Sequence, residues 1–291
     1  MQQLLDGIFL GSIYALFAVG YTLVFGVLDR LNLAHAAVFS AGALVGIEVV
    51  TSTGISIWAA VPIVMAVGAI LGLIIERVAF RPLEGRHDAH FAGLISSIAL
   101  GAIFIALLQA RYGADTRRFE PDVFPKSRFE FLGASVSVLQ LLILIISVGL
   151  MVLLTWLVAR FKMGRGMRAI SENAHAAAVL GINVNRVSSL TFAISSALGA
   201  AAGVLFTLNV NTAQLGIGHA VELKGLAVII VGGLGSLPGA VVGGLALGLA
   251  EVYAVNYVGT SWRDMVAFGL LFLILVVRPQ GIFGAKKIRE V

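Results

Sequence analysis

The sequence contains no cysteine and few charged residues: 12% of its 291 residues are Asp, Glu, Lys or Arg. The missing cysteine excludes disulfides, thiolate metal sites and cysteine nucleophiles. Soluble domains carry about 25% charged residues, and half that share cannot cover a water-facing surface. Because 59% of the residues are hydrophobic and the mean hydropathy is +1.01, the composition excludes a soluble domain and indicates a chain embedded in a lipid bilayer.

Nucleotide-binding and catalytic motifs are also missing. A P-loop requires G-x-x-x-x-G-K-[ST], but Lys126 is the only lysine followed by Ser or Thr, and Pro125 precedes it. No serine–histidine dyad and no cluster of metal ligands is recognisable. We therefore expect no catalytic residue, no metal and no cofactor, and any ATP must be bound by other subunits. The net charge of +5 is not a nucleic-acid signal, because the basic residues lie mostly in short loops.

Apolar stretches make up most of the sequence, and a membrane-spanning helix takes about 20 apolar residues. Two stretches are doubtful, because one opens with Asn32 and His35 and the other is short and runs into a glycine-rich sequence. We predict an all-α polytopic membrane protein with 8–10 transmembrane helices, including broken or re-entrant segments. Residues 1–291 are expected to form one transmembrane domain, since no linker interrupts them. The candidate spans are 4–28, 32–50, 57–79, 91–110, 138–159, 187–208, 221–234, 239–257 and 263–277.

The distribution of Lys and Arg predicts the orientation, because cytoplasmic loops are enriched in both. With the C-terminus inside, 13 of the 20 basic residues fall in inside loops, which places the loop 160–186 in the cytoplasm. The N-terminus then lies outside if nine segments cross the membrane. If one of them is re-entrant, the N-terminus lies inside. The weakest point is the loop 111–137, which is predicted to be external although it holds five basic residues. The inside set is Arg30, Arg77, Arg81, Arg86, Arg160, Lys162, Arg165, Arg168, Arg186, Arg278, Lys286, Lys287 and Arg289.

A glycine-rich sequence in each half of the chain, within 29–46 and 232–244, predicts a break in the helical backbone at membrane depth. Such a break is tolerated where it is buried in protein or lines a water-filled cavity. By analogy with transporters whose discontinuous helices hold the permeation site, the residues at these breaks are candidates for a translocation pathway. The alternative is a tight interhelical turn. The pathway candidates are Asn32, His35, Gly232, Gly233, Gly235, Ser236 and Gly239.

The loop 160–186 contains signals for a short helix. Ser171 suits its N-cap, Glu172 its first turn and Gly181 a stop just past its end. Small side chains between them, among them Ala174 and Ala178, would leave the helix backbone close to a docked partner. The alternative is a solvated connector.

Several ionisable residues fall within or near the spans. Glu48, Glu222 and Lys224 lie near predicted helix ends, where such side chains can extend to the membrane surface. Glu251 lies deeper, and its pattern fits a structural role and a pathway-lining role equally well.

Four stretches resemble the inner-membrane permease subunits of branched-chain amino-acid ABC importers, most closely the LivH type. They span nearly the whole chain, and the second and third are the more specific. They are Asn32–Ala36 after a first span holding Gly11–Leu16, Met167–Asn173 continuing through Ala178–Ile182, Lys224–Ala240, and Arg278–Gly284.

This resemblance implies a multicomponent importer in a bacterial inner membrane. A second, LivM-type permease subunit would share the pathway, with two cytoplasmic ATPases and an extracytoplasmic solute-binding protein. It implies that Glu172, Ala174, Ala178 and Gly181 contact the ATPase. The expected cargo is a branched-chain or other hydrophobic amino acid, the alternatives being urea, amides or another small solute. The family often has glycine at the position of Ala36, so a positive φ is not expected there.

Two other classes of protein are alternatives to an ABC permease. A stand-alone secondary transporter or channel would use Glu251, Glu48 or His35 for ion coupling. An intramembrane enzyme lacks the required residues.

Overall fold

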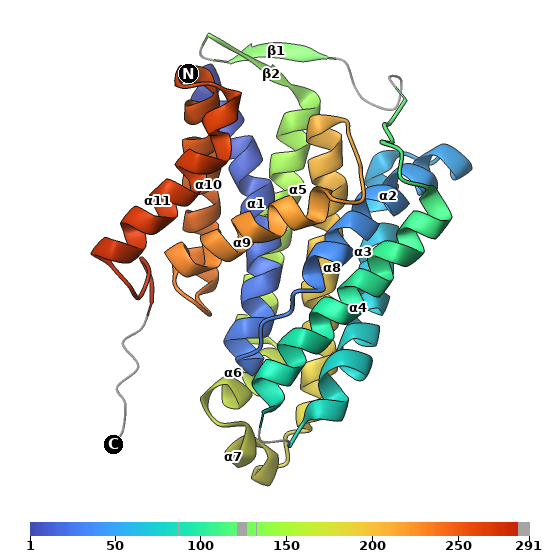
Figure 1. Ribbon diagram of the computed structural model, residues 1–291, viewed down its shortest axis with the longest axis vertical. Coiled ribbons are helices and arrows are strands. Elements are labelled where there is room, and N and C mark those ends of the chain that lie inside the picture. Colours follow the sequence, from blue (N-terminus) through green and yellow to red (C-terminus); the bar gives the residue numbers. More distant parts are fainter. Residues whose placement is uncertain (86–87, 121–126, 132, 285–291) are drawn as a thin grey trace.

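The computed structural model describes residues 1–85, 88–120, 127–131 and 133–284, and it is mostly helical (Figure 1). All nine predicted spans are helices, and eight segments of the described chain are long and apolar enough to cross a membrane. The helix α9 is the exception, with 16 residues. The expectation of a polytopic helical fold is confirmed. The nine helices are α1 Gln2–Leu28, α2 His35–Thr53, α3 Ile57–Ile75, α4 Ala89–Tyr112, α5 Val138–Arg160, α8 Val184–Val210, α9 Ile217–Gly232, α10 Leu237–Tyr257 and α11 Arg263–Val277.

Two ends of the bundle can be distinguished in Figure 1. The N-terminus lies at one end together with a hairpin of β1 Arg128–Phe131 and β2 Ala134–Ser137, which pair antiparallel. The opposite end carries α6 Lys162–Glu172 and α7 Ala174–Val179. We call these the hairpin end and the α7 end. The all-α expectation did not include the hairpin, because strands of four residues give too short an alternation to recognise.

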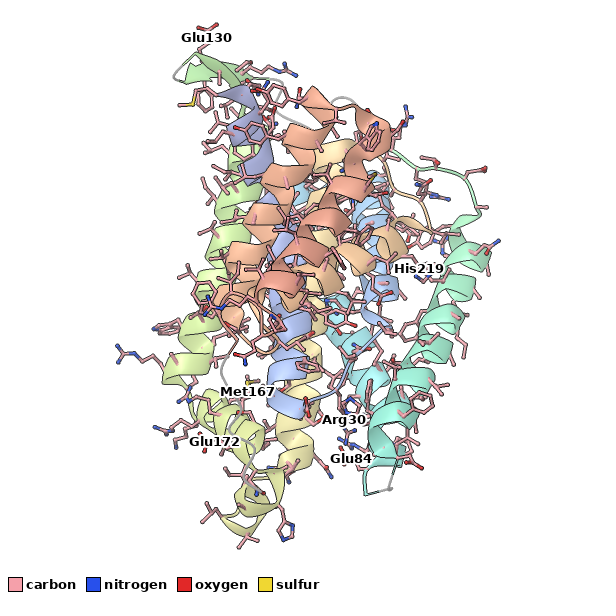
Figure 2. All side chains as sticks on the ribbon, turned by 60° about the vertical axis from the view of Figure 1, so that its left-hand side comes forward. Arg30, Glu84, Glu130, Met167, Glu172 and His219 are labelled. Atoms are coloured by element: carbon pink, nitrogen blue, oxygen red, sulfur yellow. The ribbon has the colours of Figure 1, made fainter. Side chains whose placement is uncertain are left out.

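The basic residues of the predicted inside set that the structure describes belong to loops and helix ends at the α7 end. Arg30 lies there in Figure 2, and four others lie in and beside α6. The predicted positions at Arg86, Lys126 and residues 286–289 fall outside the described residues.

Glycine pairs bring α1 and α10 into close antiparallel contact. A Cβ on Gly244 would overlap the backbone of Ala15, and one on Gly248 would overlap Gly11. On the other side of the bundle α8 packs closely on α2, where a Cβ on Gly42 would overlap the backbone of Ala200. Small residues permit such approach between membrane helices, so these glycines pack within the chain.

The helix α2 begins inside the bundle, not at its edge. Residues 29–34 return without helical structure from the end of α1, and the first residue of α2, His35, lies against Phe17 and Gly20 in the body of α1. The helix α9 starts nearby, because Gly218 contacts the carbonyl of Ala36. The predicted interruption near residue 32 therefore lies before α2, and the helix itself is continuous, with Ala36 in ordinary helical backbone.

Candidate translocation and coupling sites

The loop between α5 and α8 folds into two short helices, and its break differs from the predicted one. Asn173 is the N-cap of α7, since its Oδ1 accepts a hydrogen bond from the backbone N of Ala176 at 2.9 Å. Glu172 is the last residue of α6, and the Ser171 hydroxyl donates to the carbonyl of Arg168 at 2.8 Å. The prediction that Ser171 caps this helix is wrong, because extended backbone at Asn173 (φ −157°, ψ 106°) separates α6 from α7.

The α7 segment projects beyond the bundle. Gly181 has a φ of 86°, so the predicted positive-φ exit from this helix is confirmed. Ala174 and Ala178 are exposed, as expected for a docking face. Sequence reasoning missed Val179 and Leu180, whose exposed fractions are 77% and 81%. The available signal was two large apolar residues in a polar loop beside a helix-ending glycine.

The glycine-rich segment between α9 and α10 is a tight turn. Ser236 caps α10 by accepting a hydrogen bond from the backbone N of Gly239 at 3.1 Å. Gly232 and Gly239 approach so closely that a Cβ on either would overlap the backbone of the other. Gly233 and Gly235 have φ values of 102° and 82°, where other residues are strained. The geometry therefore matches the interhelical-turn alternative, in a turn that also contacts a cavity.

The segment after α11 is held on this turn by backbone hydrogen bonds. The backbone N of Ile282 donates to the carbonyl of Val231 at 2.8 Å, and that of Phe283 to the carbonyl of Gly232 at 3.0 Å. The stretch Arg278–Gly284 therefore packs against the glycine turn.

A cavity of about 1200 Å³ at the α7 end is lined by two of the predicted coupling residues and by one of the predicted pathway residues. Ala174 and Ala178 line one side of it, and Gly235 lines another, together with Asp29 and Arg30 at the end of α1. Gly232, Gly233, Ser236 and Gly239 form the adjoining turn. A displacement of α7 therefore changes the same space that the glycine turn borders.

The other predicted pathway residues lie apart from this cavity, in the middle of the bundle. His35 is fully buried between the rings of Phe17 (centroids 4.7 Å apart) and Tyr21 (5.4 Å), in space left by Gly20 and Gly199. Asn32 is 2% exposed, and its Oδ1 accepts from the backbone N of Ala34 at 3.2 Å. Neither residue lines this cavity, and their place in a translocation pathway stays a prediction.

A buried cluster of charges connects α9, α10 and α11. Lys224 Nζ lies 3.1 Å from Glu251 Oε1 and 3.1 Å from Asp264 Oδ1, and Arg263 also pairs with Glu251. The Tyr14 hydroxyl donates to Glu251 Oε1 at 3.2 Å. Lys224 is 7% exposed and Glu251 is fully buried, so the expectation that Lys224 reaches the membrane surface is wrong. Its partners lie 27 and 40 positions away, which no local pattern reveals.

Two further ion pairs fix helix ends. Glu48 pairs with Arg111 near the hairpin end. Glu76 is fully buried in a π-helical turn after α3, where it pairs with Arg81 at 3.1 Å and accepts a hydrogen bond from the Ser189 hydroxyl of α8 at 3.0 Å.

A helical bundle whose described residues include eight apolar segments long enough to cross a membrane defines a polytopic membrane protein. Residues 3–275 match the family described as "Branched-chain amino acid transport system / permease component". The chain belongs to this family, as the permease component of a branched-chain amino-acid ABC transport system.

Two relatives cover the whole chain. It is 35% identical to the high-affinity branched-chain amino acid transport system permease protein BraD of Pseudomonas aeruginosa, with 98% of that protein covered. It is also 35% identical to LivH of Escherichia coli K12, a permease protein with the same description, with 97% covered. A solved structure, PsaBC from Streptococcus pneumoniae in complex with Fab, has a TM-score of 0.53 at 13% identity over 97% of this chain and 94% of its own. That likeness shows the fold alone.

Membership in the family fixes the chain's role. It is a multi-pass membrane protein homologous to a bacterial inner-membrane permease, a transport component and not a catalytic one. An ABC permease works with ATPase and binding-protein partners.

Proposed function

We propose that this chain forms half of a translocation pathway for branched-chain or hydrophobic amino acids, together with a second, LivM-type permease subunit. Two cytoplasmic ATPases would dock on the loop 160–186, and an extracytoplasmic solute-binding protein would deliver cargo at the hairpin end. The observation that carries the proposal is α7, a short helix beyond the bundle that exposes Val179 and Leu180. Two adjacent apolar side chains exposed at the end of a polar loop fit a pocket on a partner.

A short, hydrogen-bonded segment connects α7 to α8, so a movement of α7 can reach the bundle. The backbone N of Ile182 donates to the carbonyl of Ala177 at 3.0 Å, and Asn183 caps α8 through the backbone N of Arg186 at 3.0 Å. Because so few residues separate α7 from α8, closure of the ATPase dimer on ATP binding would move α8, which packs on α1, α2 and α3. The cavity beside Ala178 and Gly235 would change shape in the same step. ATP hydrolysis would then reset the bundle.

The test is reconstitution of the permease pair with its ATPases and binding protein in proteoliposomes. We expect uptake of labelled leucine, isoleucine or valine that requires both ATP and the binding protein. Uptake of urea or an amide in place of amino acids would reassign the cargo within the same family. Uptake that persists without ATPases would contradict the importer mechanism and favour a stand-alone transporter or channel.

The docking residue Ala178 can be tested separately. Ala178→Asp puts a charge against the docked ATPase, where an unpaired or like charge costs several kcal/mol, so we expect little ATPase recovered with the permease and uptake below about 10% of wild type. Ala178→Ser, which is small and uncharged, is the matched control. Equal ATPase recovery and wild-type uptake in Ala178→Asp would make this loop a solvated connector.

The orientation of the loop is tested with a cysteine at Ala176. An impermeant thiol reagent should not label this cysteine in intact cells.

A further inference from the structure

The helix α9 presents an outer face in the middle of the bundle. Its first residues contact the start of α2, where His35 packs on the centre of α1. Figure 2 places His219 about midway between Glu130 at the hairpin end and Glu172 at the α7 end. The His219 side chain is 67% exposed, and Leu223, one turn later, is 57% exposed.

Lipid is an unfavourable neighbour for this face. An imidazole at the centre of a bilayer lacks hydrogen-bond partners, and ionisable groups at that depth face a bundle interior or a water-filled cavity. The outer face of α4 is different, because large apolar side chains are exposed along it, among them Ile103 at 54% and Leu107 at 61%. The face of α9 that carries His219 is therefore the one suited to water or to a polar solute.

Glu222 lies at the edge of this face. Gly218 contacts α2 at Ala36, and Gly225 contacts Phe17 of α1, so Glu222, between them on the same side of α9, faces the first turn of α2. Its Oε1 is buried and makes no hydrogen bond to any residue that the structure describes. The other oxygen, Oε2, is 3.7 Å from Nδ1 of His219.

Glu222 also differs from the other acidic residues inside the bundle. Glu251 pairs with Lys224 and Arg263, and Glu76 pairs with Arg81. In the part of the chain that the structure describes, no lysine or arginine pairs with Glu222, whose exposed fraction is 8%. An ionisable group kept at this depth without a paired lysine or arginine is a candidate for a functional role.

We propose that Glu222, with His219 beside it, binds the ammonium group of the cargo as the cargo passes along α9 between the two permease subunits. The proposal rests on the function proposed above and adds a site to it. The carboxylate supplies charge complementarity to an amino-acid ammonium group, and His219 borders the path.

Cysteine reactivity tests the site without requiring transport, since the natural chain has no cysteine. In the assembled importer in proteoliposomes, His219→Cys should react with water-soluble methanethiosulfonate reagents at least about tenfold faster than Ile103→Cys, the control on the apolar face of α4. Equal rates would place α9 against lipid or dry protein and overturn the proposal.

The role of Glu222 is tested by comparing how fast His219→Cys reacts with positively and with negatively charged methanethiosulfonate reagents. In His219→Cys, a reagent with an ammonium group should react faster than one with a sulfonate. Adding Glu222→Gln should lower this ratio about tenfold, the equivalent of about 1.4 kcal/mol, while Glu222→Asp should keep most of it. A ratio that Glu222→Gln leaves unchanged would show that the carboxylate does not act on cations in the path.

Uptake separates this proposal from the proposed function. Glu222→Gln alone should slow leucine uptake about tenfold. Wild-type uptake in Glu222→Gln would overturn the site and leave the importer intact. A wild-type complex without ATP-dependent amino-acid uptake would instead overturn the proposed function.

Discussion

The middle and the C-terminal end of α9 are fixed in different ways. At mid-helix Lys224 is held by side-chain charges on α10 and α11, whereas at the C-terminal end Gly232 is held by backbone contact with Gly239 and hydrogen bonding to the segment after α11. The first arrangement depends on charge and tolerates changes in shape. The second depends on shape and contains no charge. Changes of charge should therefore act on the middle of α9, and changes of size on its C-terminal end.

The largest effect is expected from breaking the charge cluster. Glu251→Gln leaves Lys224 and Arg263 with Asp264 as the one remaining carboxylate of the cluster. Removing one partner from buried ion pairs costs about 3–5 kcal/mol, so we expect a lowered melting temperature in detergent and reduced membrane levels. The measurement is thermal unfolding of the purified permease pair.

Glu48→Gln is the control for this prediction, because it removes a carboxylate whose side chain is 31% exposed and whose partner Arg111 is 67% exposed. Its expected effect is about 1 kcal/mol or less. Equal stability of the two variants would show that the cluster at Glu251 does not fix α9.

The glycine turn should show the opposite pattern, with protein present and transport lost. Gly233→Leu forces a branched side chain into a φ of 102° against the backbone of Gly284, which costs about 1–2 kcal/mol for the backbone alone and shifts the turn. We expect normal insertion and uptake below about 10% of wild type. Gly235→Leu, at a φ of 82° beside Gly26, should behave alike.

Gly269 provides the matched control, since a Cβ there meets nothing within 4 Å. Gly269→Leu should insert and transport normally. Normal uptake by both turn variants at normal membrane levels would remove the turn from the transport mechanism.

The smallest effect is expected at the solvent edge of the charge cluster. The side chain of Asp264 is 68% exposed, so water replaces much of what Asp264→Asn removes, and the expected loss is about 1 kcal/mol or less. A modest drop in the melting temperature, smaller than that of Glu251→Gln, is the outcome to measure. A loss of stability as large as that of Glu251→Gln would mean that the exposed Asp264 contributes as much to the cluster as the buried Glu251.

Much of the fold could be predicted because long apolar runs have few alternatives. Each of the nine runs is a helix, and the positive φ of Gly181 followed from its place after an alanine-rich turn. The choice between two neighbouring N-cap residues was harder to predict. Ser171 and Asn173 are both good N-caps, and Asn173 takes the role because α6 continues through Ser171 to Glu172.

The sites were less predictable because they depend on pairing between distant segments. The burial of Glu222 and Lys224 follows from residues 211–216 carrying the start of α9 to the first turn of α2, which hydropathy does not show. Val179 and Leu180 are apolar residues that a core could have used, and only the three-dimensional arrangement shows that they are exposed.

The interior start of α2 has a consequence for biosynthesis. This helix packs on α8 through contacts such as Gly42 with Ala200 and Gly46 with Val204, and α8 is made roughly 150 residues later. At about 5–20 residues per second, α2 waits about 8–30 s for its main partner. During that interval the non-helical residues 29–34 cannot rest in lipid, where unpaired backbone groups are costly. The nascent chain must therefore be sheltered by the insertion machinery, or held near the membrane surface, until the helices that cover these residues, α4 among them, are in place.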